Sequence, residues 1–311
     1  MARLALAAQA FQLPRLRAVL PHLPPCEARG FDLCDQGYAE ALTGWRPHVV
    51  LQYGSETTDE PRAELNRRYA LAPALAPTFF AENAWLPQSA HLYLDPLGLA
   101  DQSSFAALNA DELEEPADAD AYDGALAAYR GGRQPVPAAR REPYLLLCLQ
   151  VPDDTVVLRA SPVQDMQVLI DLLEDRLAGA KLVVRPHPLD PREYRTRRAG
   201  LRRDGAVAEW IRGARAVIAC NSTTLVEAVA WSTPAVALGR GVFSGKGVCE
   251  EHDGRLDRLR GEPSPRLDEG AARRFLWGVF RRQVPLDPAL PDLTRYNPVL
   301  PAIRSALQCA S

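Results

Sequence analysis

Short apolar runs alternate with longer segments of helical periodicity along most of this chain, and this alternation constrains its fold more than any other feature. Apolar runs of about four to eight residues are typical of buried strands, whereas apolar residues spaced three or four apart mark one face of a helix. Strands and helices that alternate in this way form parallel sheets covered by helices. We therefore predict an α/β fold, with a helix over 163–177 as the clearest helical segment. Strands are predicted at Arg3–Ala8, Phe31–Cys34, His48–Tyr53, Pro77–Ala81, Tyr144–Val151, Lys181–Arg185, Ala216–Cys220 and Ala235–Leu238.

The stretch 109–141 is the best candidate for a boundary between two domains. It begins with an acidic run and ends in Gly131-Gly132-Arg133-Gln134-Pro135-Val136-Pro137, which has the composition of a linker. It divides the chain into halves that are each long enough for a small α/β domain. We predict an N-terminal domain over 1–140, a second domain over 141–270, and C-terminal helices within 271–311.

Composition argues against several classes of protein. With 36 Lys and Arg against 39 Asp and Glu, the formal net charge of −3 disfavours a protein that binds nucleic acid by neutralising phosphates. The six cysteines include no C-x-x-C pair, so we expect neither structural zinc nor disulfides. The apolar run Leu4–Ala8 is shorter than the ~7–15 residues of a signal peptide, and no stretch reaches ~18 apolar residues. We expect a cytoplasmic protein, either free or peripheral to the inner membrane.

Polar residues directly follow three predicted strands of the second half. They are Asp153 and Asp154, then His187 between two prolines, then Asn221-Ser222-Thr223 before a helix that carries Glu227. In an α/β fold such residues lie at the carboxyl ends of the strands, where ligands bind. The sequence therefore predicts an anion-binding or catalytic site there.

Each of these residues also has a purely structural interpretation. Asp153 and Asp154 either cap the following turn or supply a nucleophile or base, and capping is the stronger interpretation for Asp153. Ser222 and Thr223 either begin a helix or also bind an anion through its N–H groups. His187 is either a histidine of a surface loop or a donor to a phosphate oxygen.

In the N-terminal half, only the strand near residues 77–81 ends in an acid, an amide and an aromatic residue together, namely Glu82, Asn83 and Trp85. Glu82 and Asp154 would form a carboxylate pair across a cleft, suited to acid/base or nucleophilic catalysis. Two other segments resemble binding sites but do not fit them. The segment 241–247 is one residue too short for a phosphate-binding loop, and the arginines of 192–203 fit a solvated helix face better than a nucleic-acid site.

Four segments in this order resemble the capsule polysaccharide biosynthesis proteins that act as β-Kdo glycosyltransferases. The resemblance covers roughly residues 75 to 250. Ala84 stands where the family usually has glycine. The segments are Glu82-Asn83-Ala84-Trp85-Leu86-Pro87 with Asp95-Pro96-Leu97-Gly98, Gln150-Val151-Pro152-Asp153-Asp154, Arg185-Pro186-His187-Pro188, and Asn221-Ser222-Thr223 with Glu227-Ala228.

The resemblance implies a GT-B-like architecture, with two Rossmann-like domains and C-terminal helices that cross back to the N-terminal domain. It implies CMP-Kdo as donor, no metal or other cofactor, and retention through a covalent sugar–enzyme intermediate on Asp154. By the same resemblance, His187 and Ser222 would hold the phosphate with help from Thr223, and Glu227 would lie near the nucleotide. Glu82 would be an acid/base or orient the sugar. Arg185, Gln150 and Asn221 are assigned to the nucleotide-sugar site as motif residues.

The expected partners are the CMP-Kdo donor, a glycan or glycolipid acceptor, and a capsule-assembly complex at the inner membrane, with no nucleic acid. Three alternatives stay open at this stage. They are a transferase for another CMP-nonulosonate such as sialic acid, a UDP-sugar epimerase-like enzyme, and a catalytically silent subunit of a surface-glycan complex.

Overall fold

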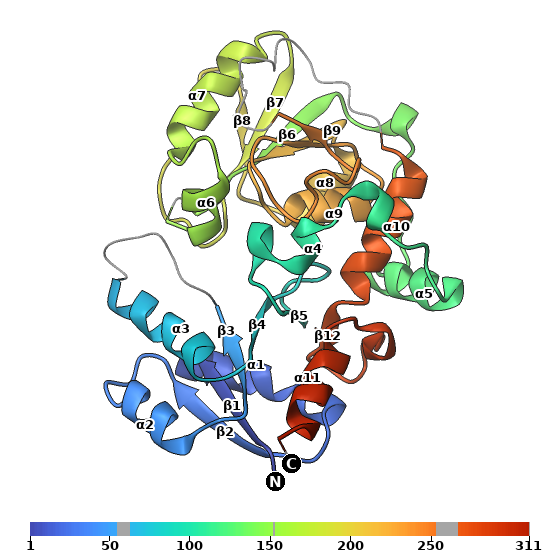
Figure 1. Cartoon of the computed structure of the whole chain (residues 1–311). Coiled ribbons are helices and arrows are strands. Elements are labelled where there is room, and N and C mark those ends of the chain that lie inside the picture. Colours follow the sequence, from blue (N-terminus) through green and yellow to red (C-terminus); the bar gives the residue numbers. More distant parts are fainter. Residues whose placement is uncertain (55–62, 152, 253–266, 311) are drawn as a thin grey trace. The chain divides into compact units, whose positions relative to one another are not determined.

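The structure is a computed structural model that describes residues 1–54, 63–151, 153–252 and 267–310 (Figure 1). The chain divides into two compact units. Unit 1 comprises Met1–Ala107, Asp118–Ala128 and Gly278–Ser311, and unit 2 comprises Leu108–Ala117 and Tyr129–Trp277. Each unit is built around one six-stranded sheet.

The sheet of unit 1 has the order β12-β5-β4-β3-β1-β2. Strands β1 to β4 pair in parallel, whereas β5 runs antiparallel to β4 and β12 runs antiparallel to β5. The sheet is therefore mixed, and the prediction of parallel sheets is wrong for this part of it. A parallel strand after β4 would need a crossover, but only seven residues separate β4 from β5. The strands are β1 (Arg3–Ala8), β2 (Glu27–Asp32), β3 (Val49–Tyr53), β4 (Thr78–Asn83), β5 (His91–Asp95) and β12 (Gln283–Pro285).

Both faces of this sheet are covered, which is why β1 is apolar at nearly every position. Leu4 and Leu6 point into one core, and Ala5 and Ala7 point into another on the opposite face. The first core includes residues of α11, so the C-terminal helix packs on the sheet of unit 1, as the family resemblance implies (Figure 1). The helices of this unit are α1 (Leu13–Arg17), α2 (Tyr38–Trp45), α3 (Ala63–Leu75), α4 (Ser104–Ala107), most of α5 (Ala119–Arg130) and α11 (Leu300–Gln308).

All strands of unit 2 are parallel, in the order β11-β10-β9-β6-β7-β8. Counted from β6, this is the Rossmann order, in which the winding reverses between the first and fourth strands. The prediction of a Rossmann-like second domain is confirmed. The strands are β6 (Tyr144–Cys148), β7 (Lys181–Arg185), β8 (Gly200–Leu201), β9 (Ala216–Ala219), β10 (Ala235–Ala237) and β11 (Glu250–Glu251). The helices are α6 (Thr155–Ala160), α7 (Met166–Arg176), α8 (Val207–Gly213), α9 (Thr224–Ala230) and α10 (Glu269–Phe280), which continues into unit 1.

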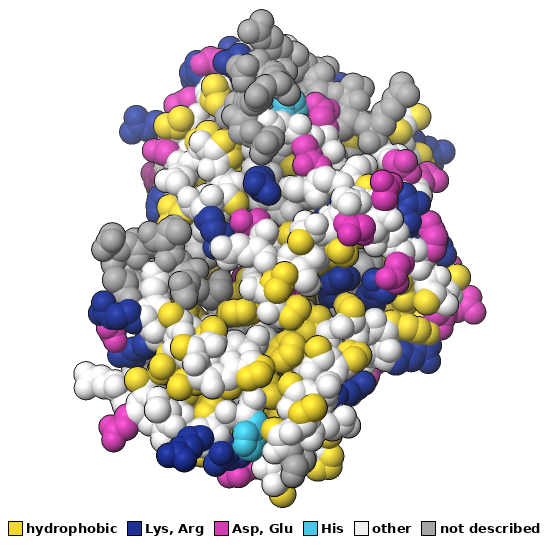
Figure 2. Space-filling model, in the orientation of Figure 1, with side chains coloured by type: hydrophobic (Ala, Val, Ile, Leu, Met, Phe, Trp, Pro, Cys, Tyr) yellow, Lys and Arg dark blue, Asp and Glu magenta, His cyan; other side chains and the backbone are white. Residues whose placement is uncertain are grey.

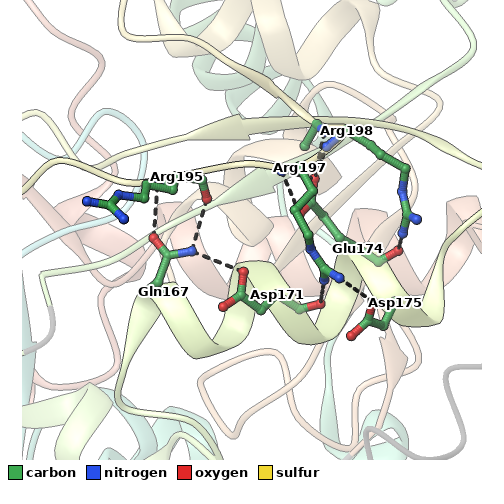
Figure 3. Close-up of polar contacts among 8 residues, drawn as sticks. Gln167, Asp171, Glu174, Asp175, Arg195, Arg197 and Arg198 are labelled. Atoms are coloured by element: carbon green, nitrogen blue, oxygen red, sulfur yellow. Dashed lines mark hydrogen bonds and ion pairs between the residues drawn. The ribbon is translucent and has the colours of Figure 1, made fainter.

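The strand predicted at Phe31–Cys34 is shifted, since β2 spans Glu27–Asp32, and two further segments differ in kind from their predicted structure. The stretch 109–141 contains the 12-residue helix α5, so it is not a simple linker. The arginine-rich segment 192–199 is not helical, and it lies along α7 (Figure 3). Its arginines are used within the protein, and on the face shown in Figure 2 acidic and basic side chains are interspersed.

Glu174 of α7 holds this segment in place. Its buried carboxylate accepts backbone N–H bonds from Arg197, Arg198 and Ala199 at 2.9, 2.6 and 2.7 Å (Figure 3). Gln167, the second residue of α7, bonds both the N–H and the C=O of Arg195, as a neighbouring strand would. Burial alone would raise the pKa of Glu174, but these N–H groups outweigh it and hold the pKa below its ordinary value.

We expect Glu174→Gln to lower the free energy of unfolding by about 1–3 kcal/mol at pH 7, because an amide offers one acceptor oxygen where the carboxylate offers two. Since the pKa of Glu174 is lowered by folding, this contribution is present above about pH 4 and is lost as the pH falls further. Asp175→Asn is the matched control, because Asp175 pairs with Arg197 at 2.8 Å on the exposed side of the helix. The free energy of unfolding of both variants is measured with urea at pH 7 and pH 3.5. Equal losses of stability in the two variants would contradict the role of Glu174 in holding the segment 192–199.

Candidate functional site

The predicted site residues of unit 2 come together at the carboxyl edge of its sheet. Gln150 and Asp154 follow β6, His187 follows β7, and Ser222 and Thr223 follow β9. These three strands are neighbours in the order β9-β6-β7. The winding reverses between β6 and β9, and in open sheets of this kind ligands bind at such a point of reversal.

Gln150 and Asn221 join the loops that follow β6 and β9. The Gln150 Nε2 donates to Asn221 Oδ1 at 2.7 Å, and the Asn221 backbone N–H donates to Gln150 Oε1 at 2.9 Å. The Asn221 Nδ2 donates to the carbonyl oxygen of Val156 in α6 at 2.9 Å. Both side chains are thus engaged with the protein.

Asp154 is the N-cap residue of α6, where its Oδ1 accepts the N–H of Val156 at 2.8 Å. Asp154 therefore has a capping role at the start of α6, and the capping interpretation of Asp153 stays a prediction. The Asp154 side chain is exposed, so capping and access to a ligand are compatible. Pro152, which precedes the pair in the motif, lies outside the described residues.

His187 is half-buried, and its ring nitrogen Nδ1 accepts the N–H of Leu189 at 3.2 Å. This bond places the proton of a neutral imidazole on Nε2, which is then a donor. Burial lowers the pKa of His187, while the negative charges of Asp154 and Asp190 act in the opposite direction. The carboxylate of the β6 loop and the imidazole of the β7 loop therefore interact electrostatically, as a joint site requires.

Asp190 is a residue that sequence reasoning missed. Its buried side chain accepts the N–H of Arg192 at 3.1 Å and the hydroxyl of Tyr194, and its own N–H donates to the carbonyl of His187 at 3.0 Å. It therefore holds the turn that presents His187. The signal in the sequence was an acid three residues after the histidine and just before a proline, a common turn composition.

Arg185 is the last residue of β7, and its guanidinium bonds to the backbone of the protein. Both terminal nitrogens of its guanidinium donate to backbone carbonyls, at 2.6 Å to Asp204 and 2.5 Å to Gly205. These bonds hold the turn before α8. The guanidinium of Arg185 is thus engaged with the backbone of the protein at the end of β7.

Ser222 and Thr223 lie where the chain passes from β9 into α9. The Ser222 Oγ accepts the N–H of Thr224 at 3.2 Å, and Thr223 is the N-cap residue of the helix. Within the described ranges, no protein group accepts from the backbone N–H groups of Ser222 and Thr223. Two such donors and the Ser222 hydroxyl are suited to an anion.

Glu227 lies one turn further along α9, and its Oε2 accepts a hydrogen bond from the Tyr129 hydroxyl at 2.9 Å. Burial raises the pKa of Glu227 to about 7, and the bond from Tyr129 opposes this only in part. The carboxyl group is therefore partly protonated at neutral pH and can both donate and accept. Tyr129 was missed because it falls in the stretch assigned to a linker.

Glu82 lies in β4 of unit 1, whereas the other predicted site residues belong to unit 2. Its Oε2 accepts from the buried hydroxyl of Tyr93 at 3.1 Å, and Tyr93 stacks on Trp85 with ring centroids 4.3 Å apart. The segment after Glu82 is held by Gln283 of β12, which accepts the N–H groups of Trp85 and Leu86 and donates to the carbonyl of Leu86. The pairing of Glu82 with Asp154 stays a prediction.

No cluster of three or more His, Cys, Asp or Glu side chains suited to a metal ion occurs in the described part of the chain. Among the same residues, no helix has the length and apolar character to cross a membrane. A cavity of about 820 Å³ lies beside the start of α7 and contains none of the predicted residues. It is lined by Gln164, Asp165, Met166, Gln167, Asp171, Arg192, Glu193, Tyr194 and Arg195.

Comparisons with known proteins concern the fold and the sequence family. Residues 127–272 match the family model of the capsule polysaccharide biosynthesis protein. A search of the curated proteins found no match. Among solved structures, the chain is similar to KpsC of Thermosulfurimonas dismutans, described as a β-Kdo 2,7 transferase, with a TM-score of 0.63, 14% identity and coverage of 100% of both chains.

A second KpsC structure from the same organism, described as a β-Kdo 2,4 transferase, matches with a TM-score of 0.58 and 16% identity over 96% of this chain and 98% of that chain. At these identities the likeness shows a shared fold, and the predicted GT-B-like fold is confirmed. Over residues 127–272 the chain is also similar in sequence to the capsule polysaccharide biosynthesis proteins, the family that the four ordered motifs resemble.

Proposed function

We propose that this protein is a glycosyltransferase of capsule or surface polysaccharide synthesis that moves Kdo from CMP-Kdo to a glycan or glycolipid acceptor. The observation that carries the proposal is the convergence of Asp154, His187 and the Ser222-Thr223 turn at one edge of a Rossmann-type sheet. The shared fold with KpsC and the family match of residues 127–272 support it.

The phosphate of the donor would lie at the Ser222-Thr223 turn. The N–H groups of both residues and the Ser222 hydroxyl would donate to its oxygens, and His187 Nε2–H would donate from the neighbouring loop. Donors that are already oriented stabilise the charge that develops on the leaving phosphate without reorganisation. The proposed site contains no free cation at Arg185, whose terminal nitrogens are bonded to carbonyls.

Asp154 would be the nucleophile of a retaining reaction. A carboxylate oxygen attacks the anomeric carbon, the bond from that carbon to the phosphate oxygen breaks, and CMP leaves with the electron pair. The acceptor hydroxyl then displaces Asp154, loses its proton to a base, and restores the original configuration. Glu82 would be that base or would orient the sugar, and capping of α6 would fix the direction of Asp154.

Glu227 would lie against the ribose of the nucleotide. Its pKa of about 7 allows the carboxyl group to exchange hydrogen bonds with hydroxyl groups in either protonation state. Tyr129 would set its orientation through the bond of 2.9 Å.

Replacing Asp154 separates its two roles. Asn also caps helices, so Asp154→Asn should keep the stability of the wild type but lower transfer by on the order of a thousandfold or more. Asp154→Ala should lose transfer equally and also about 1 kcal/mol of stability. Asp153→Asn is the control and should transfer within a few fold of wild type. Wild-type transfer rates in Asp154→Asn would overturn the nucleophile assignment.

Nucleotide preference is measured by thermal unfolding with CMP, UDP, GDP and ADP at equal concentration, each with and without EDTA. A ligand at about 100 times its dissociation constant adds about 2.7 kcal/mol, which raises the melting temperature by several degrees. We expect a rise with CMP that EDTA does not change. A rise with UDP alone would contradict the proposal and favour an epimerase-like enzyme.

The pH dependence of stability tests Glu227. Because folding raises its pKa to about 7, the folded state holds a proton that the unfolded state releases above about pH 4, so stability falls as the pH rises from about 4 to 7. Relative to Glu227→Gln, the wild type should lose about 1–3 kcal/mol between pH 5 and pH 8 in urea unfolding. Tyr129→Phe removes a bond that lowers this pKa, so it should extend the loss to higher pH. A constant difference between wild type and Glu227→Gln would refute the raised pKa.

A further inference from the structure

The Gln150–Asn221 pair spans the point at which the sheet of unit 2 reverses its winding. The two residues are 71 positions apart in sequence and follow the adjacent strands β6 and β9. Two hydrogen bonds in opposite directions join them, from side chain to side chain and from backbone to side chain. Such a reciprocal pair fixes both the distance and the rotation between the two loops.

Hydrogen bonds connect this pair to α6 through a single residue, Val156. Asn221 Nδ2 donates to the carbonyl of Val156, and the N–H of the same Val156 donates to Asp154 Oδ1. One chain of hydrogen bonds therefore runs from Gln150 through Asn221 and Val156 to Asp154. Asn221 also precedes Ser222 directly, so the same residue bears on the proposed phosphate site.

The side chains of this pair are little available to a ligand. Gln150 is only 9% exposed, and its amide oxygen and nitrogen both bond to Asn221. The Oδ1 and Nδ2 of Asn221 are both engaged as well. A ligand that turned either side chain toward itself would break bonds whose loss leaves buried polar groups unsatisfied, which costs more than one exposed hydrogen bond gains.

We propose that Gln150 and Asn221 are positioning residues, which hold Asp154 at a fixed place relative to the phosphate-binding turn of Ser222 and Thr223. This assignment rests on the proposed function and replaces a direct role of the two side chains in nucleotide binding. Their loss should affect the chemical step, because a displacement of about 1 Å between nucleophile and leaving group costs on the order of a hundredfold in rate.

The test is a double-mutant cycle that compares the wild type with Gln150→Ala, Asn221→Ala and the double variant. Two quantities are measured: the dissociation constant of CMP by calorimetry, and kcat of transfer from CMP-Kdo. Each single variant should lower kcat tenfold or more, the double variant should fall no more than about twofold below the worse single variant, and the CMP dissociation constant should change less than about threefold throughout.

Gln164→Ala is the matched control, because Gln164 Nε2 donates to the carbonyl of Leu158 at 2.9 Å and so supports the same helix away from the pair. It should leave both quantities unchanged. If the alanine variants fold poorly, Gln150→Glu replaces them. It has nearly the same shape and still accepts from the Asn221 N–H, but it sets an oxygen against Asn221 Oδ1, so the same loss of kcat is expected.

Losses of CMP affinity that multiply in the double variant would overturn the proposal, because each side chain would then bind the nucleotide itself. The proposal would also be overturned if the losses of kcat in the two single variants multiplied in the double variant. If the wild type binds no CMP, the proposed function fails. The connection between the two loops is then tested by the unfolding midpoints of the single and double variants. A double variant no less stable than the worse single one then supports the connection between the loops, and additive shifts contradict it.

Discussion

The reversal of winding between β6 and β9 is the constraint on which the site depends. Right-handed crossovers leave these adjacent parallel strands toward opposite faces of the sheet, so the loops after them diverge at its carboxyl edge. A polar ligand can enter there, but the divergence also leaves the loops without mutual support. Gln150 and Asn221 supply that support through two hydrogen bonds, and a third bond extends it to α6.

The polar groups of the proposed site are neutral hydrogen-bond donors and carboxyl groups. Arg185 and Arg197, which stand out in the sequence as cations, are used to hold turns and an extended segment in place. The groups left for a phosphate are the N–H groups of Ser222 and Thr223 and the imidazole of His187. This arrangement fits a leaving group that carries its own charge and needs oriented dipoles more than a counterion.

The sequence predicted the fold, and it predicted which polar residues follow the strands of unit 2, because strand periodicity and polar strand ends are local signals. Lys181–Arg185 is a strand with the predicted bounds, and His187 follows it as expected. Features that depend on partners far along the chain were not predictable. Nothing local shows that Gln150 bonds Asn221, that Tyr129 bonds Glu227, or that β12 from the proline-rich tail joins the sheet of unit 1. The cap of α6 at Asp154 depends on where the turn ends, which composition does not specify.

The central claim is that Asp154 forms a covalent bond to the transferred sugar. The most direct measurement is mass spectrometry of the protein incubated with CMP-Kdo in the absence of acceptor, followed by proteolysis to locate any adduct. The account predicts a Kdo adduct on the peptide that contains Asp154, its absence in Asp154→Asn, and its disappearance when acceptor is added. Transfer by the wild type with no adduct on this peptide, or an equal adduct in Asp154→Asn, would contradict it.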